Sequence, residues 1–406
     1  MTMHEDDRSR EGRVLATELT RRGLVKSAAA ATAGAAVFGG AAKFGARSAA
    51  AAAPSAAQAA AGEQLFYNYA LQNNPLTYDF NSNLYAGAEP EVWAGLLTFD
   101  PDGRVVPDWA ERWESNEDAS VWTFYLRQNN KGWSNGDPVT AHDAVWSLAR
   151  ILNPETNNSY AFILYDVKNG EAFNGGTAKV EDLGLKAIDD WTVEITLEGP
   201  RANFPQKIAY TACVFAHRPS VEQHGEKWAL GGDIPLVSNG PYKLDLWEQG
   251  VKAVHSLNPG YWDAETIRVT KLIDPIIPGD QTALAFESGK GDQQLDWTPV
   301  GAADLQRFQG DPNLAPLLKQ FVFPGIWMLL PSNGQAPFDK IEVRRALSHA
   351  IDRDRLVTVT NGLALPANVM TPVGVYGYFE DPAISEIQKF DPALAMEALK
   401  GTEYEG

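Results

Sequence analysis

The chain has 406 residues, 44% of them hydrophobic and 21% charged, which is a composition typical of globular proteins. This length exceeds what one hydrophobic core usually supports, so we expect at least two domains. The 34 basic and 52 acidic residues give a net charge of −18. Such a surface repels phosphate backbones, which argues against nucleic acid as a partner. After the first sixty residues no apolar run reaches the ~20 residues that cross a bilayer, so we expect no membrane-spanning segment in the mature part.

The first 61 residues are predicted to be an export signal and a low-complexity region. Arg21 and Arg22 precede an Ala/Gly-rich stretch over 27–40, and small-x-small cleavage sites follow at 57–59 and 59–61. This order resembles a twin-arginine signal. The alternative is a chance arginine pair in a disordered tail. Because no cysteine lies near the cleavage region, we expect no lipid anchor and a mature protein that is free in the periplasmic (extracytoplasmic) space.

Alternation and turn chemistry predict the elements in the first part of the mature chain. Residues 65–70 form a predicted strand, and the apolar spacing over 89–98 predicts a helix. Residues 99–104 contain the Pro and Gly of a tight turn. Its Asp-x-Asp-Gly start resembles a calcium loop, but the later ligand positions are missing, which favours the turn. Alternating residues predict strands over 121–126 and 191–197.

Three helices have well-marked starts. Thr140 can cap the first, Asp143 completes a capping box, and Pro154 ends the helix. The second is predicted to begin at Asp339, and the third at Asp391 with proline in its first turn. Their predicted apolar stripes are Val145, Leu148, Ala149 and Leu152; Val343, Ala346, Leu347, Ala350 and Ile351; and Leu394, Ala395, Ala398 and Leu399. Mixed strands and helices indicate an α/β or α+β architecture.

The sequence shows no motif of an enzyme or a metal site. Cys213 is the only cysteine, which excludes an internal disulfide and Cys-based zinc sites, and its apolar neighbours predict a buried thiol. The six histidines include no H-E-x-x-H, and no G-x-S-x-G elbow is present. We therefore predict no catalytic residue, no metal and no cofactor. A hydrolase site assembled from distant residues stays an alternative.

Six segments together resemble the extracellular solute-binding proteins of the dipeptide/oligopeptide/nickel type, the family 5 solute-binding proteins of ABC importers. They are Gly95–Gly103 with Val106–Trp113, Trp122–Arg127 with Gly136–Asp143, Asn239–Tyr242, Asn258–Trp262, Pro337–Asp339 and Val343–Arg353. Each is weak alone, but they occur in order across residues 65–391. The sequence departs from the family pattern at Lys131–Asn135 and at Pro331-Ser332. Most of these motif residues are expected to be structural rather than ligand-contacting.

The resemblance implies an α/β, two-lobed fold like that of periplasmic binding proteins, of type II and the large oligopeptide-binding subclass. Lobe I would cover residues 62–270 and lobe II residues 271–406. The second lobe is expected to be incomplete, with the chain's return to lobe I missing. We therefore expect this chain by itself to have poor solubility and not to be a competent binding protein.

The resemblance also suggests residues that line a ligand cleft. Some belong to the loop after the first strand, others follow a strand near residue 296, and the last lies further along the chain. The candidates are Asn73, Asn74, Tyr78, Trp297, Thr298 and Trp327. Aromatic walls with a few polar groups suit a small-molecule cleft, whereas tryptophan is also common in cores.

The function implied is capture of peptides or similar small solutes and their delivery to an ABC permease, without catalysis and as a monomer. One alternative is binding of an oligosaccharide or an opine-type solute for import or for chemosensing. A second alternative, with less support in the sequence, is an extracytoplasmic hydrolase. The ligand's identity stays open at this point.

Overall fold

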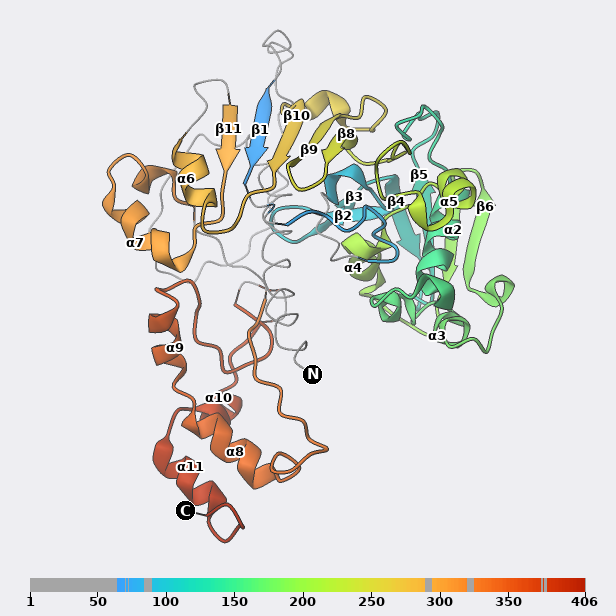
Figure 1. Cartoon of the computed structure of the whole chain (residues 1–406). Coiled ribbons are helices and arrows are strands. Elements are labelled where there is room, and N and C mark those ends of the chain that lie inside the picture. Colours follow the sequence, from blue (N-terminus) through green and yellow to red (C-terminus); the bar gives the residue numbers. More distant parts are fainter. Residues whose placement is uncertain are drawn as a thin grey trace, which may run out of the picture. The chain divides into compact units, whose positions relative to one another are not determined.

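The computed structural model describes residues 64–69, 71, 73–83, 90–288, 294–319, 325–373, 375 and 378–405 (Figure 1). The chain divides into two compact units, and the described residues up to Thr298 form one while those from Pro299 form the other. Arg21 and Arg22 lie outside the described residues. Among the described helices, none has the length and apolar character needed to span a membrane.

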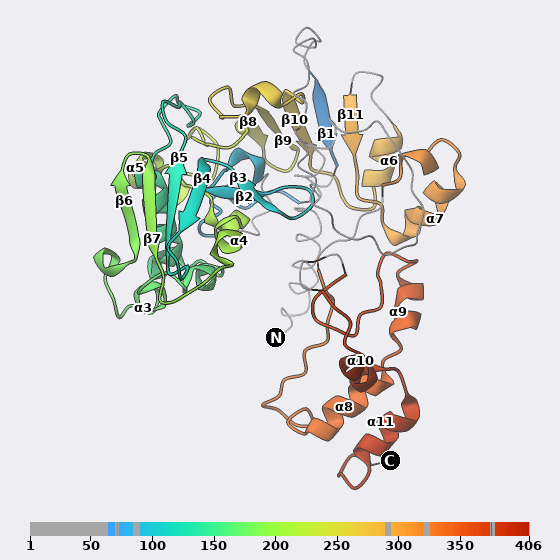
Figure 2. The ribbon, with the colours of Figure 1, turned by 180° about the vertical axis from the view of Figure 1, so that it is seen from behind.

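The unit of residues 64–298 contains three sheets. A five-stranded sheet has the order β11-β1-β10-β9-β8, a four-stranded sheet has the order β4-β5-β7-β6, and β2 pairs with β3 (Figure 2). The strands are β1 (Leu65–Asn68), β2 (Leu97–Phe99), β3 (Val105–Pro107), β4 (Ala110–Ser115), β5 (Val121–Leu126), β6 (Leu185–Asp189), β7 (Thr192–Thr196), β8 (Tyr242–Glu248), β9 (Lys252–Leu257), β10 (Lys271–Pro275) and β11 (Gln294–Trp297).

Helices accompany the sheets and make up most of the regular structure after residue 298. The α-helices are α2 (Ala141–Leu152), α3 (Gly170–Asn174), α4 (Phe204–Ile208), α5 (Arg218–His224), α6 (Thr282–Glu287), α7 (Ala302–Gly310), α8 (Ile341–Ala350), α9 (Arg353–Val359), α10 (Pro382–Gln388) and α11 (Pro392–Leu399). Short 3-10 turns include η1 (Pro90–Val92), η3 (Ala161–Leu164), η5 (Thr211–Cys213) and η6 (Gly225–Lys227). In the second unit, α8 packs against α10 and α11.

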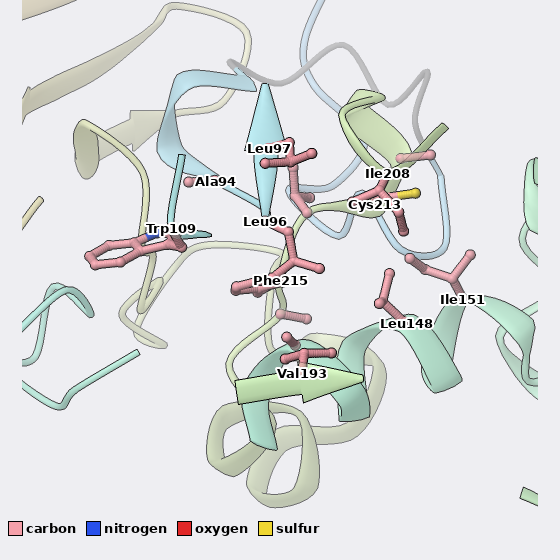
Figure 3. Packing of buried hydrophobic residues seen from close by; sticks show 14 of the residues in the cluster. Ala94, Leu96, Leu97, Trp109, Leu148, Ile151, Val193, Ile208, Cys213 and Phe215 are labelled. Atoms are coloured by element: carbon pink, nitrogen blue, oxygen red, sulfur yellow. The ribbon is translucent and has the colours of Figure 1, made fainter. Parts of the chain in front are cut away.

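One large core joins α2 to the four-stranded sheet and to the segments around β2. Leu148 and Ile151 point from α2 toward Cys213, and Val193 reaches the same core from β7 (Figure 3). The Cys213 thiol is 1% exposed, and burial raises its pKa to about 12. The prediction of a buried thiol is therefore confirmed.

The Asn239–Tyr242 motif fastens the irregular chain that enters β2. The Asn239 side chain accepts a hydrogen bond from the Ala94 amide (3.1 Å) and donates one to the Ala94 carbonyl (3.0 Å). Trp109 Nε1 donates to the Asn239 carbonyl at 3.1 Å. Gly240 lies so close that a Cβ there would be 2.4 Å from the Glu91 carbonyl oxygen. Only glycine fits at this contact without movement of the backbone.

Two more of the motifs meet at the Asp108 carboxylate. Asp108 is 3% exposed and accepts hydrogen bonds from Tyr261 Oη (2.9 Å) and Trp262 Nε1 (3.0 Å). The Asn258 side chain donates to the carbonyls of Gly132 and Gly240, both at 3.0 Å. The motifs therefore hold one another together, which agrees with a structural role for most of their residues.

The predicted elements with alternation or a clear cap are confirmed. β1, β5 and β7 fall within the predicted ranges, and the turn over 99–104 has Gly103 at φ 77°. Thr140 N donates to Asp143 Oδ2 at 2.8 Å before α2, which ends ahead of Pro154. Asp391 caps α11 by accepting from two backbone amides, each at 3.1 Å.

The helix predicted over 89–98 is wrong. This segment forms only η1 and then β2, and Val92, Trp93 and Leu96 are all buried. These residues are buried because this non-helical segment passes through the core, and not because they form the apolar face of a helix. The bonds between Ala94 and the Asn239 side chain also occupy the backbone groups that a helix would have used.

Two predicted helix faces need adjustment, and of the stripe predicted for α11 only Ala395 is buried. α8 begins at Ile341 rather than at Asp339, and of its predicted stripe only Ala346 is buried. The compact units divide after Thr298 rather than at residue 271, because β10 and β11 both hydrogen-bond to β1. The assignment of the chain to two lobes with a boundary near 271 stays a prediction.

We predict that Gly240→Ala lowers the free energy of unfolding by about 1–3 kcal/mol, because the new Cβ would force the Glu91 backbone to move. Gly199→Ala is the matched control, since nothing lies within 4 Å of a Cβ there. It should change the free energy by no more than about 0.5 kcal/mol. Urea unfolding followed by tryptophan fluorescence measures both, and equal effects would contradict the packing argument.

Candidate functional site

The carboxyl ends of three strands meet at one edge of the five-stranded sheet. β1 runs parallel to both β10 and β11, with Phe66 opposite Leu272 and Asn68 opposite Trp297. Figure 1 shows the three arrowheads pointing in the same direction. In open α/β sheets ligands bind outside this edge, so it is the first place to look for a site.

A depression of about 440 Å³ opens directly after β10. Its lining residues come from the turn after the strand and from α6: Ile276, Ile277, Pro278, Gln281, Leu284, Ala285 and Ser288. The volume is within the range of small-molecule pockets, and the lining is mostly apolar with two polar side chains. The Ile277 amide donates to the Leu71 carbonyl at 3.2 Å, which joins this turn to the loop after β1.

The loop after β1 contains three of the predicted ligand residues, and only one of them is exposed. Asn73 is exposed. The Asn74 Oδ1 atom accepts hydrogen bonds from Trp247 Nε1 (3.2 Å) and the Gly250 amide (2.9 Å), so Asn74 fastens the loop to the β8–β9 hairpin. Tyr78 has no exposed surface and its hydroxyl lies 3.0 Å from His255 Nε2. In this structure Asn74 and Tyr78 support the loop instead of presenting a side chain to a ligand.

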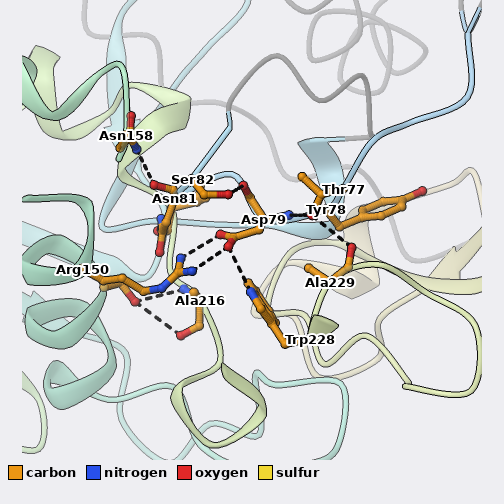
Figure 4. Close-up of polar contacts among 12 residues, drawn as sticks. Thr77, Tyr78, Asp79, Asn81, Ser82, Arg150, Asn158, Ala216, Trp228 and Ala229 are labelled. Carbon is orange, nitrogen blue, oxygen red and sulfur yellow. Dashed lines mark hydrogen bonds and ion pairs between the residues drawn. The ribbon is translucent and has the colours of Figure 1, made fainter. Parts of the chain in front are cut away.

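A buried ion pair holds the next part of the same loop. Arg150 of α2 donates two hydrogen bonds to the Asp79 carboxylate, at 2.7 and 2.6 Å, and Trp228 Nε1 donates a third at 3.1 Å (Figure 4). The side chains are 14% and 10% exposed for Arg150 and Asp79. A bidentate pair with little solvent around it fixes both distance and orientation.

An aromatic cluster that the sequence analysis missed is connected to Asn81, which follows this loop in the chain. Tyr160 lies 5.6 Å from Phe162 and 5.7 Å from Tyr210, measured between ring centroids, with interplanar angles of 31° and 28°. Phe162 is 57% exposed. Asn158 connects the cluster to the loop, since its side chain donates to the Asn81 carbonyl (2.6 Å) and accepts from the Tyr160 amide (2.6 Å). An exposed aromatic surface of this kind suits apolar or aromatic groups of a ligand.

The remaining predicted residues lie in two different places. Trp297 ends β11 and its carbonyl accepts from the Tyr69 amide at 2.9 Å, while Thr298 is buried beside it. Both are therefore at the carboxyl edge described above. Trp327 belongs to the other compact unit and is 83% exposed. Ligand contacts of Asn73, Trp297, Thr298 and Trp327 stay predictions.

The titratable side chains of the described residues offer little for catalysis or metal binding. No group of three or more His, Cys, Asp or Glu in the described ranges is placed to hold a metal ion. His217 Nδ1 lies 2.7 Å from Ser220 Oγ and its Nε2 lies 3.9 Å from Asp137 Oδ2, so the two ring nitrogens have exchanged the partners that they have in a hydrolase triad. Burial lowers the pKa of His217, but Ser220 is itself buried and the contact is local, across the first turn of α5. We read it as a helix-start contact.

Comparison with known proteins gives the family to which this mixed α/β chain belongs. The family model described as "Bacterial extracellular solute-binding proteins, family 5 Middle" matches residues 104–406. The chain belongs to this family, which consists of solute-binding proteins and not of enzymes. The resemblance seen in the sequence is confirmed.

Named relatives are similar over most of this chain. It is 36% identical over 290 residues to the periplasmic oligopeptide-binding protein OppA of Salmonella typhimurium, which covers 70% of this chain and 51% of the relative. It is 30% identical over 353 residues to the probable deoxycholate-binding periplasmic protein YgiS of Escherichia coli, covering 84% and 64%. The chain thus spans about half the length of the first curated relatives that it matches.

Solved structures agree on the fold. Burkholderia pseudomallei OppA is 27% identical with a TM-score of 0.68, covering 84% of this chain and 67% of that one. Haemophilus influenzae OppA in complex with the peptide RPPGFSPFR is 25% identical with a TM-score of 0.67, covering 83% and 66%. The predicted fold class, a mixed α/β fold of the type II periplasmic binding proteins, is confirmed.

We predict that Asp79→Asn lowers the free energy of unfolding by about 3–5 kcal/mol, because it leaves the Arg150 guanidinium buried without its counter-ion. The matched control is Asp102→Asn, which breaks an ion pair with Arg104 whose side chains are 68% and 73% exposed. This change should cost less than about 1 kcal/mol. Chemical denaturation measures both variants, and a small effect of Asp79→Asn would show that the pair does not hold the loop.

Proposed function

We propose that this chain is the solute-binding component of an ABC importer, that it captures oligopeptides outside the cytoplasm, and that it delivers them to a permease as a monomer. The observation that carries the proposal is the carboxyl edge of β11, β1 and β10, with its 440 Å³ apolar depression. The aromatic cluster around Tyr160 supplies a second surface for ligand side chains. Membership of the family and the peptide in the Haemophilus influenzae OppA complex support the same ligand class.

The geometry favours binding over catalysis. The depression is lined by aliphatic groups, proline, one amide and one hydroxyl, and none of its lining residues is an acid, a base or a thiol. Such a site can bury apolar surface and form a few hydrogen bonds, but its lining has no group that could transfer a proton near neutral pH. We therefore propose binding without turnover.

A second ligand class has a specific observation in its favour. The relative from Escherichia coli that is 30% identical is named as a probable deoxycholate-binding protein. The apolar depression, or separately the aromatic cluster, would also suit a steroid face or the apolar face of a sugar. Import and chemosensing would use the same binding step.

We further propose export by the twin-arginine route. The support is the sequence alone, in which Arg21 and Arg22 precede a weakly apolar Ala/Gly-rich stretch and small-x-small sites.

The proposed function predicts that the chain binds RPPGFSPFR and releases it intact, and the same experiment tests the expectation from the sequence that this chain by itself is not a competent binding protein. Isothermal titration measures the affinity, and mass spectrometry of the released ligand shows whether it has been altered. Tyr160→Ala should weaken binding about tenfold by removing the centre of the aromatic cluster. The control is Tyr125→Ala, which removes a tyrosine that pairs with Arg112 and Glu114 on the four-stranded sheet.

Deoxycholate and a maltooligosaccharide form the comparison arms of this experiment. Binding of either of them without binding of the peptide would favour the alternative ligand classes. Recovery of a cleaved peptide at catalytic rates would contradict the proposal of a non-enzyme.

We predict that replacing Arg21 and Arg22 together by lysine leaves the precursor in the cytoplasm, because the twin-arginine route reads the guanidinium pair. Cell fractionation and immunoblotting measure the distribution of the protein. Lys26→Arg, which keeps the charge near the pair, is the control and should be exported normally. Normal export of the double variant would rule out this route while leaving other export signals open.

A further inference from the structure

Four buried polar side chains in contact with one another connect the two ends of the loop after β1. Asn68 Nδ2 donates to Asp274 Oδ1 at 2.7 Å, His255 Nδ1 lies 3.1 Å from Asp274 Oδ2, and Tyr78 Oη lies 3.0 Å from His255 Nε2. Asn68 is the residue before loop 69–77 and Tyr78 is the residue after it. We call these four residues, Asn68, Asp274, His255 and Tyr78, the His255 network.

The sheet register explains why the first three of these side chains meet. Leu272 of β10 lies opposite both Phe66 of β1 and His255 of β9. Residues two apart on a strand share a face, so Asn68 and Asp274 project from the same face as His255. Tyr78 covers this face from the loop, and its ring meets that of Trp247 edge to face at 5.4 Å. All four residues of the network are 0–3% exposed.

Each residue of the His255 network contacts at least one other member through a polar atom. The contact between His255 and Asp274 is within ion-pair distance but lacks hydrogen-bond geometry. Because a carboxylate can only accept, a proton on His255 Nδ1 suits this contact, and in that tautomer Nε2 can accept from the Tyr78 hydroxyl. Removing one member therefore takes a buried polar contact away from its neighbour in the network.

We propose that the His255 network positions loop 69–77 for ligand binding, with His255 as the central positioning residue. This inference rests on the proposed function. The loop exposes Asn73 and Leu76, the latter by 69%, beside the turn that forms the depression. An amide and an aliphatic side chain suit the main chain and an apolar side chain of a peptide. The network fixes where these two groups stand without touching the ligand itself.

The test uses the full chain with Tyr78→Phe, which removes one buried oxygen and keeps the ring that packs on Trp247. We expect affinity for RPPGFSPFR to fall about tenfold. Amide hydrogen exchange at residues 69, 78 and 277, whose N–H groups bond to Trp297, Ala229 and Leu71, should become about tenfold faster. His255→Asn, which retains a donor near Asp274 but cannot reach Tyr78 in the same way, should have the same two effects.

The matched control is Ile195→Val, a fully buried change on β7 of the other sheet. It lowers overall stability, but it should leave both the peptide affinity and the exchange at residues 69, 78 and 277 as in the unmodified chain, once global unfolding is corrected for. If the effects came from a general loss of stability, Ile195→Val would also weaken peptide binding and speed exchange at these residues. That result would overturn a positioning role.

The remaining outcomes separate this inference from the proposed function. If the unmodified chain binds no peptide, the proposed function fails before any variant is made. If it binds, and Tyr78→Phe and His255→Asn change neither affinity nor exchange, the His255 network has no positioning role. Faster exchange with unchanged affinity would likewise overturn the proposal, because the network would then hold a loop that the ligand does not use.

Discussion

The paired hydrogen bonds between the Asn239 side chain and the Ala94 backbone are the constraint on which the larger unit depends. Residues 93–96 cross the core without forming a helix or joining a sheet, so their peptide groups need partners from elsewhere. Asn239 supplies an acceptor and a donor at once, and Gly240 lets the two segments approach. The Trp109 indole then bonds to the Asn239 carbonyl, which brings β3 and β4 to the same point. Asp108 and Asn258 act in the same way. Their buried side chains form hydrogen bonds between segments that are not paired in a sheet.

This constraint also explains which parts of the fold the sequence could predict. α2 could be predicted because two neighbouring residues, Thr140 and Asp143, mark its start. β5 and β7 could be predicted because a strand with one buried face alternates between buried and partly exposed residues. The segment over 89–98 was not, since its burial is set by Asn239, more than 140 residues later in the chain. Local apolar spacing cannot distinguish a helix stripe from a chain that is surrounded by core on all sides.

The candidate site was predicted only as a region. The family resemblance placed a ligand-facing loop after β1 and a strand end near Trp297, and the parallel register of β1 and β11 brings these two together. The resemblance could not show that the Tyr78 side chain is buried. Its hydroxyl contacts His255, which lies 177 positions away in the sequence. The aromatic cluster around Tyr160 was missed for a related reason. Tyr160 and Phe162 show no periodicity, and Tyr210 joins them only in the folded chain.

The contacts around the loop bear on how a ligand could be bound. The Asp79–Arg150 pair and the His255 network anchor residues on either side of the exposed Asn73 and Leu76, and anchored ends reduce the conformational entropy that a loop loses on binding. The Asp79 and Arg150 charges close to the loop offset one another inside the protein. The surfaces left for a ligand are the aliphatic lining of the depression, the rings of Tyr160 and Phe162, and the Asn73 amide. Apolar burial is non-directional, and an amide can pair with any peptide group, so these surfaces would accept peptides of varied sequence more readily than they would select one charge pattern.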